Sequence, residues 1–307
     1  MNPVLIRATR SSQYDIGKTL VIAGFPRSGT TWLAELIATM PRTAVLFEPL
    51  DHRLIPAARR AGLSWENFRE PDESWPEGER FMREVLSGRV LTSQTTSHIP
   101  CGRAVDISRW IVKFVRANQM LGWLVEHMKI PPPVFIIRHP CAVYSSWVAR
   151  GWPLVTYRLP DSLRFFSHYP EHTEWIRTLT RPEEIFTAQW GMQHRVALDQ
   201  MRGRDYYMCV YERMIRNGPG EINAVFSHWN LGVPENMELA LRHPSAKASD
   251  TLKGGSKSQL DAWTHRLDKI VVNRMISVLK RLGLDFYADS PEPDYAKLSE
   301  VAGRTIG

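Results

Sequence analysis

The chain is poor in cysteine, and its few cysteines form no recognisable motif. Only three occur in 307 residues, far apart at Cys101, Cys141 and Cys209. An odd and scattered set provides neither the framework of a disulfide-rich domain nor a Cys-x-x-Cys metal or redox motif. This usage is typical of a reducing compartment, and we expect a cytoplasmic protein.

Long apolar runs are also missing. The longest run near the start covers residues 19–25, far short of the roughly 20 residues that a membrane-spanning helix needs. Asp15 and Lys18 precede it, which is not the pattern of a secretory signal sequence. We therefore expect neither a signal peptide nor a membrane anchor.

The charge balance is mildly basic. The sequence has 39 Lys and Arg against 32 Asp and Glu, a formal net charge of +7. Such an excess favours anionic partners, among them phosphorylated cofactors and nucleic acids. A nucleic-acid-binding protein would need its basic residues clustered on one surface, whereas here they are spread along the chain. We therefore expect a compact anionic ligand and no nucleic-acid partner.

Short apolar runs alternate with helix-like patterns, which is typical of an α/β protein with a central parallel β-sheet flanked by helices. We expect one domain over residues 1–307. Two polar, aromatic-rich segments, 51–108 and 151–185, interrupt the alternation and are expected as insertions at the edge of the sheet where a substrate binds. The predicted strands are 19–25, 44–47, 110–114, 134–137 and 207–211.

The strongest local signal is a loop between the first strand and a helical pattern. It combines a tight turn at a glycine, three hydroxyl residues and a helix start, which together present backbone N–H groups to an anion. An arginine in the turn adds a fixed positive charge. We expect this phosphate-binding loop to consist of Arg27, Ser28, Gly29, Thr30, Thr31 and Trp32.

This loop differs from the Walker A loop of nucleoside triphosphatases, in which a Lys precedes the hydroxyl residue. Here Thr30 follows Gly29 directly. A nucleotide kinase or triphosphatase that depends on Mg²⁺ is therefore only the second hypothesis for the function. The simplest alternative is a structural turn in which a Ser or Thr caps the helix.

The stretch Pro26–Trp32 resembles the loop that binds the 5′-phosphosulfate in sulfotransferases that use 3′-phosphoadenosine 5′-phosphosulfate (PAPS). Residues 134–146 resemble the element of the same family that binds the 3′-phosphate. In that element an Arg ends a strand and a Ser follows eight positions later, which gives Arg138 and Ser146 here. An Arg at a strand end offers a planar fork for two contacts to a phosphate.

Three weaker matches extend the resemblance along the chain. They correspond to a strand that carries a lysine towards the sulfuryl group, a Tyr-Glu pair after a later strand, and a C-terminal loop that covers the cofactor. The resemblance implies a P-loop NTPase-like sulfotransferase fold, PAPS as donor, PAP (adenosine 3′,5′-bisphosphate) as product, and no metal. The residues concerned are Lys113, Tyr211, Lys253, Gly254 and Gly255.

Sulfuryl transfer needs a base for the acceptor's proton and cations for the developing negative charge. Arg27, Lys113 and also Lys253 are candidates for the cations, in the place that Mg²⁺ takes in phosphoryl transfer. We expect the acceptor to be a hydroxyl or an amine of a small metabolite, natural product, lipid or sugar.

Two residues are candidates for the base. Glu48 follows a predicted strand 21 residues after Arg27, a position that resembles the catalytic glutamate of the tyrosylprotein branch and of related carbohydrate and bacterial enzymes. Because Glu48 stands between the apolar residues Phe47 and Pro49, we expect partial desolvation to raise its pKa. The plainer alternative is that Glu48 pairs with an Arg or caps a helix.

The second candidate base is His98. The cytosolic small-molecule branch of the family has a His two residues after the lysine that Lys113 resembles, but Val115 stands there in this sequence. His98 lies in a His-Ile-Pro sequence similar to the His-Leu-Pro of that branch, yet it precedes Lys113. We therefore prefer Glu48 as the base.

Overall fold

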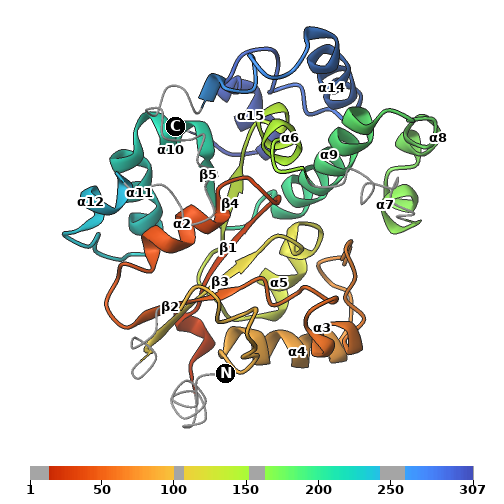
Figure 1. Cartoon of the computed structure of the whole chain (residues 1–307). Coiled ribbons are helices and arrows are strands. Elements are labelled where there is room, and N and C mark those ends of the chain that lie inside the picture. The colour runs from red at the N-terminus through yellow and green to blue at the C-terminus, as the bar shows by residue number, and fades with distance from the viewer. Residues whose placement is uncertain (1–13, 100–106, 152–162, 243–259, 307) are drawn as a thin grey trace.

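The structure is a computed structural model, and it describes residues 14–99, 107–151, 163–242 and 260–306. A five-stranded sheet lies at the centre of the described chain (Figure 1). All its strands are parallel, in the order β2-β3-β1-β4-β5. The strands are β1 (Leu20–Gly24), β2 (Thr43–Phe47), β3 (Arg109–Phe114), β4 (Val134–Ile137) and β5 (Tyr207–Val210). The predicted parallel sheet is confirmed, and each of the five apolar runs forms a strand.

The central strand β1 pairs with strands that are distant in the sequence. Leu20 is in register with Ile111 of β3, and Ile22 is in register with Val134 of β4. The chain therefore moves to one side of β1 for β2 and β3 and to the other side for β4 and β5. In parallel sheets, ligands bind beyond the carboxyl ends of the strands where the direction of winding changes, which is the position of the loop after β1.

Helices cover both faces of the sheet (Figure 1). One face is covered by α2 (Thr30–Ile37), α10 (Tyr211–Arg216), α11 (Gly218–His228) and α12 (Met237–Leu241). The other face carries α4 (Pro76–Leu86), η2 (Asn118–Met120), α5 (Leu121–His127), α6 (Pro140–Val148), α9 (Pro182–Met201) and α14 (Lys269–Arg281). The remaining helices are η1 (Ile16–Lys18), α3 (Pro56–Arg60), α7 (Leu163–His168), η4 (Pro170–His172), α8 (Thr173–Arg177) and α15 (Tyr295–Ala302). None of the helices in the described ranges combines the length and apolar character that crossing a membrane requires.

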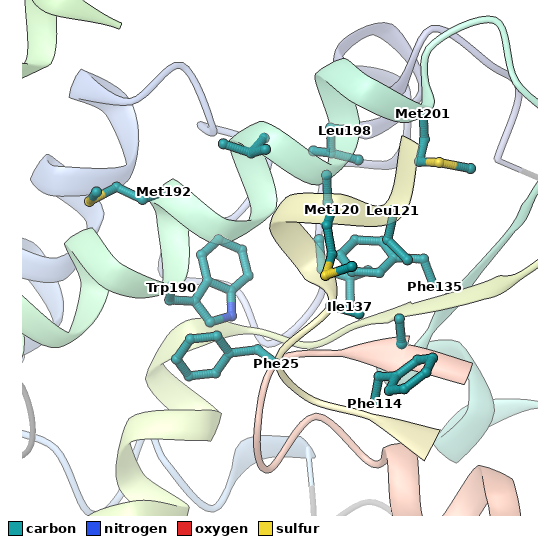
Figure 2. Close-up of a cluster of buried hydrophobic side chains, with 14 of the residues drawn as sticks. Phe25, Phe114, Met120, Leu121, Phe135, Ile137, Trp190, Met192, Leu198 and Met201 are labelled. Atoms are coloured by element: carbon teal, nitrogen blue, oxygen red, sulfur yellow. The ribbon is translucent and has the colours of Figure 1, made fainter. Parts of the chain in front are cut away.

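The core consists of two hydrophobic clusters, one on each face of the sheet. Successive strand residues alternate between them, so that Val21 packs in one cluster and Ile22 in the other. Figure 2 shows part of the larger cluster, with Phe114 and Phe135 of the sheet and Trp190 and Leu198 of α9. Because both faces are buried, the strands form a fixed base for the loops at their carboxyl ends.

The two segments predicted as insertions contact each other at α7. Arg164 of α7 donates hydrogen bonds to Glu73 Oε2 (2.5 Å) and to the carbonyl oxygen of Phe68 (3.3 Å). His168 Nδ1 lies 3.1 Å from Glu70 Oε1. Parts of 51–108 and 151–185 therefore lie side by side, and their role on the acceptor side stays a prediction.

Candidate active site

The predicted phosphate-binding loop leaves the end of β1 with an unusual backbone. Arg27 and Gly29 have positive φ angles of 71° and 92°, and Gly29 is the N-cap of α2 without a side chain that could cap the helix. A Cβ atom on Gly29 would lie 2.6 Å from Cδ2 of Tyr211. Only glycine therefore allows this loop to pass so close to Tyr211. The helix end, which no side chain caps, is then available to an anion.

The structure brings the two predicted phosphate elements into direct contact. Nη1 of Arg138 donates a hydrogen bond to the carbonyl oxygen of Arg27 (2.8 Å). Nε and Nη2 of Arg27 both lie 3.3 Å from Oγ of Ser146. The sequence predicted Arg27 for the sulfate end of the donor and Ser146 for the 3′-phosphate end. Here the Arg27 side chain points to the Ser146 end.

The Tyr211 ring packs against Arg138 and against the start of α2. The guanidinium carbon of Arg138 lies 4.1 Å from the centre of the Tyr211 ring, and the Trp32 ring meets the same ring edge-on at 6.3 Å. One aromatic ring thus contacts the start of α2, Gly29 and Arg138. This arrangement fixes the positions of the loop after β1 and the turn after β4 relative to each other.

The electrostatics of this region favour a bound anion. Burial, together with the neighbouring cations Arg150 and Arg138, lowers the pKa of Arg27 to about 10. Oγ of Ser28 and Nε of Arg138 are buried and have no hydrogen-bond partner among the residues that the structure describes. A phosphate or sulfate group would supply both the missing acceptors and the opposing charge. The residues therefore fit a phosphorylated donor.

Arg150 is a further cation of this site that the sequence motifs did not indicate. It lies two residues beyond the end of α6 (Pro140–Val148), and its positive charge lowers the pKa of Arg27. Its place beside Arg27 depends on how α6 packs against the loop after β1, so no local pattern indicated it.

A second group of charged residues surrounds Glu48 at the end of β2. The backbone N–H of Glu48 donates to the carbonyl oxygen of Lys113 (3.1 Å), which extends the pairing of β2 with β3 by one residue. Nζ of Lys113 donates to Glu48 Oε1 (2.5 Å), and Nη1 of Arg116 lies 3.3 Å from Oε2. The φ angle of Glu48 is +47°, a conformation that non-glycine residues rarely adopt outside functional sites and turns.

The expected rise in the pKa of Glu48 is wrong. Burial does raise this pKa, but the charges and hydrogen bonds of Lys113 and Arg116 together outweigh burial and lower it below its usual value. The expectation considered only the apolar sequence neighbours Phe47 and Pro49, whereas the cations lie on β3 (Lys113) and two residues after its end (Arg116). Glu48 is therefore an ionised carboxylate at neutral pH.

Arg116 and Asp51 are site residues that the sequence did not reveal. Arg116 is 5% exposed and Asp51 is 2% exposed, and Nη2 of Arg116 donates to Asp51 Oδ2 (2.8 Å). Arg116 follows β3 three positions after Lys113, and Asp51 follows Glu48 by three positions. The available signal was a pair of opposite charges. Asp51 follows β2 and Arg116 follows β3, and the carboxyl ends of these two neighbouring strands meet at one edge of the sheet.

The alternative base His98 lies in the same region. Its ring stacks on Phe47 with centroids 4.1 Å apart, and Nε2 is 3.9 Å from Oε1 of Glu35 on α2. Nζ of Lys113 lies 4.4 Å from the centre of the Phe47 ring. Glu48 thus hydrogen-bonds directly to Lys113, whereas His98 and Lys113 each contact the Phe47 ring.

Buried polar residues support the turn that carries Arg138. The backbone N–H of His139 donates to Glu212 Oε1 (2.8 Å), and the Tyr287 hydroxyl lies 3.0 Å from Glu212 Oε2. The His139 ring stacks on Trp263 at 4.5 Å. Trp263 follows the predicted cofactor-covering loop, whose residues Lys253, Gly254 and Gly255 lie outside the described residues.

Comparison with known proteins gave several matches. A model of the sulfotransferase family matches residues 19–235. No curated protein sequence matches the chain. Among solved structures, a sulfotransferase domain from the curacin biosynthetic pathway is 12% identical, covers 87% of this chain and 97% of its own, and has a TM-score of 0.48.

Two further solved structures are similar. A mouse sulfotransferase complexed with PAP is 13% identical over 92% of this chain and 89% of its own, with a TM-score of 0.46. A sulfotransferase from Mycobacterium avium is 12% identical over 95% of this chain and 81% of its own, with a TM-score of 0.44. The family model, which spans β1 to β5 and both charged groups described above, is the decisive match. The chain belongs to the sulfotransferase family.

Proposed function

We propose that this protein transfers the sulfuryl group of PAPS to a hydroxyl or an amine of a small acceptor and releases PAP. Sulfuryl transfer follows from the family. The donor, the acceptor class and the roles of individual residues are the proposal. The observation that carries it is the contact of Arg27, Arg138 and Ser146 at the carboxyl ends of β1 and β4. We expect the acceptor to be a metabolite, natural product, lipid or sugar.

The donor is a compact anion with phosphates at two ends, which matches the distribution of cations. The loop of residues 28–32 offers backbone N–H groups at the start of α2, and Arg138 offers a planar fork. Arg27 is held among other arginines at the cost of a lowered pKa. A bound phosphate would remove that penalty, so donor binding and charge neutralisation of this cluster occur together.

Glu48 accepts the proton of the acceptor in this proposal. The acceptor oxygen or nitrogen attacks sulfur, its bond to hydrogen breaks, and the proton passes to a Glu48 oxygen. The bond between sulfur and the bridging oxygen of the donor breaks, and PAP leaves with that electron pair. Because Lys113 and Arg116 keep Glu48 ionised, the base is ready at neutral pH.

Lys113 connects the base with the sulfuryl group. Its ammonium is buried and hydrogen-bonded to Glu48 Oε1, and negative charge develops on the sulfuryl and bridging oxygens during transfer. If Lys113 turns towards that charge, Glu48 loses one of its two cations. The proton affinity of Glu48 then rises as the acceptor proton is released. Lys113 thus serves both the stabilisation of charge on the sulfuryl group and the transfer of the proton to Glu48.

Calorimetry with PAP tests this function. We expect micromolar binding by the wild type without Mg²⁺, and a loss of about 3 kcal/mol or more, on the order of a hundredfold in affinity, in Arg138→Ala. Arg204→Ala is the matched control, since Arg204 pairs with the exposed Glu126. Absence of PAP binding by the wild type, or binding of ATP with Mg²⁺ instead, would refute the proposal and favour a kinase or triphosphatase.

A further inference from the structure

Arg116 bridges two buried carboxylates beside the base. Its Nη1 lies 3.3 Å from Glu48 Oε2, and its Nη2 lies 2.8 Å from Asp51 Oδ2. One planar guanidinium thus spans the carboxylate that follows β2 directly and the carboxylate one turn later. A fork of fixed geometry constrains the orientation of both partners.

The surroundings hold Arg116 in place without help from Lys113. The guanidinium carbon lies 4.6 Å from the centre of the Trp65 ring. Nδ2 of Asn67 donates to the carbonyl oxygen of Arg116 (3.0 Å). Asp51 is itself fixed by Arg53, whose Nε and Nη2 donate to its two oxygens at 3.0 and 2.8 Å. The position of Arg116 therefore depends on the segment after β2 and not on the donor site.

Lys113 is held differently. Its ammonium is a point charge at the end of a flexible stem, with one hydrogen bond to Glu48 at 2.5 Å and the Phe47 ring beside it. A lysine of this kind changes partners by rotating its side chain. When it leaves Glu48, Arg116 is the cation that still contacts the buried carboxylate.

We propose that Arg116 is a positioning residue, anchored by Asp51, that keeps Glu48 oriented and ionised while Lys113 serves the sulfuryl group. The inference rests on the proposed function, because it assumes that Glu48 is the base. It assigns a role in the reaction to the segment 51–67, which carries Asp51, Trp65 and Asn67. Among the described residues, the charged and titratable groups that face this site are Lys113, Arg116, Asp51, His52, Arg53, His98 and, through its charge on Lys113, Arg27.

The test measures turnover against pH, with release of PAP from PAPS and water as the acceptor. In Arg116→Gln, Glu48 loses a neighbouring cation, so its protonation moves to higher pH. The acid limb of the kcat profile should then shift upward by roughly one pH unit or more, and kcat at neutral pH should fall at least tenfold. Arg116→Lys keeps the charge without the fork. We expect it to leave the acid limb near its wild-type position and still to lower kcat.

Arg53→Gln is the matched control. Arg53 is half-exposed and contacts Asp51 and the Trp65 ring, as Arg116 does, and it is not placed at the base. Because Arg53 also holds Asp51, this variant is a control for the acid limb alone. We expect its acid limb to match that of the wild type and its kcat to fall less than that of Arg116→Gln. Asp51→Asn keeps the shape of the anchor and should lower kcat through Arg116, which gives a second route if Arg116→Gln does not fold.

Calorimetry with PAP separates the two proposals. We expect all four variants to bind PAP as the wild type does, since the side chain of Arg116 contacts Glu48, Asp51 and the Trp65 ring. A wild type that does not bind PAP would overturn the proposed function itself. A folded Arg116→Gln with an unchanged acid limb and unchanged kcat would overturn the positioning role alone. An Arg53→Gln profile that shifts as far as that of Arg116→Gln would also overturn it.

Discussion

Replacing Gly29 by alanine tests how the loop after β1 is built. The substitution adds a single methyl group at a residue with a φ of +92°. That methyl carbon would lie 2.6 Å from Cδ2 and 2.8 Å from Cε2 of Tyr211, far inside van der Waals contact. Either the loop or the Tyr211 ring must then move, and Arg138 rests on the same ring.

Two effects contribute to the expected loss of stability. A non-glycine residue in the left-handed region costs roughly 1–2 kcal/mol, and overpacking a tight contact costs typically about 1–3 kcal/mol. The unfolding free energy should therefore fall by roughly 2–5 kcal/mol. If Tyr211 moves from beneath Arg138, the lost cation–π contact of about 0.5–2 kcal/mol weakens PAP binding by roughly twofold to thirtyfold.

Gly203→Ala separates the two effects. Gly203 also has a positive φ, of 76°, but a Cβ atom there meets nothing within 4 Å. It should lose only the backbone contribution and bind PAP like the wild type. Denaturant unfolding and calorimetry with PAP measure both quantities. If Gly29→Ala proves as stable as Gly203→Ala and keeps full PAP affinity, the close contact with Tyr211 does not shape the donor site.

Two further predictions concern Glu48 and Glu212. Glu48→Gln should keep PAP affinity and lose about 10²–10⁴-fold in turnover, whereas His98→Ala should remain active; the opposite pattern of activities would make His98 the base. Burial raises the pKa of Glu212 to about 7 from 4.5, so its folded state holds a proton that the unfolded chain releases, and stability is lost as the pH rises towards 7. Relative to the wild type, Glu212→Gln should thus gain roughly 2–3 kcal/mol of unfolding free energy between pH 5 and pH 8. Denaturant unfolding at both pH values measures this difference, and a constant difference would mean that Glu212 is ionised throughout.

The strands and the backbone turn after β1 were predictable from the sequence because their signals are local. Buried parallel strands are continuous apolar runs, and each of the five runs became a strand. The run over residues 207–211 was predicted one residue too long, since Tyr211 begins α10. The glycine and the hydroxyl residues of the loop are likewise neighbours in the chain, so their combination is visible before folding.

The surroundings of Glu48 were not predictable in the same way. Its pKa depends on Lys113 and Arg116, which are 65 and 68 positions away in the sequence. Local neighbours suggested desolvation, and desolvation is real, but these two cations outweigh it. Arg116 escaped notice because its role depends on Trp65 and Asn67 folding over it. Such contacts are fixed by the pairing of β2 with β3, which the strand patterns alone do not specify.

The position of β1 in the middle of the sheet has a consequence for the synthesis of the chain. The loop after β1 is made early, yet the hydrogen bond from Arg138 to the carbonyl of Arg27 joins residues 111 positions apart. The Tyr211 ring that limits Gly29 is made later still. During translation, β1 is therefore complete before its neighbours β3 and β4 have been synthesised. Contacts of such long range slow folding. A ribosome-bound chain that ends before β5 should lack the proposed donor site, although the whole loop from Arg27 to Trp32 has already been synthesised.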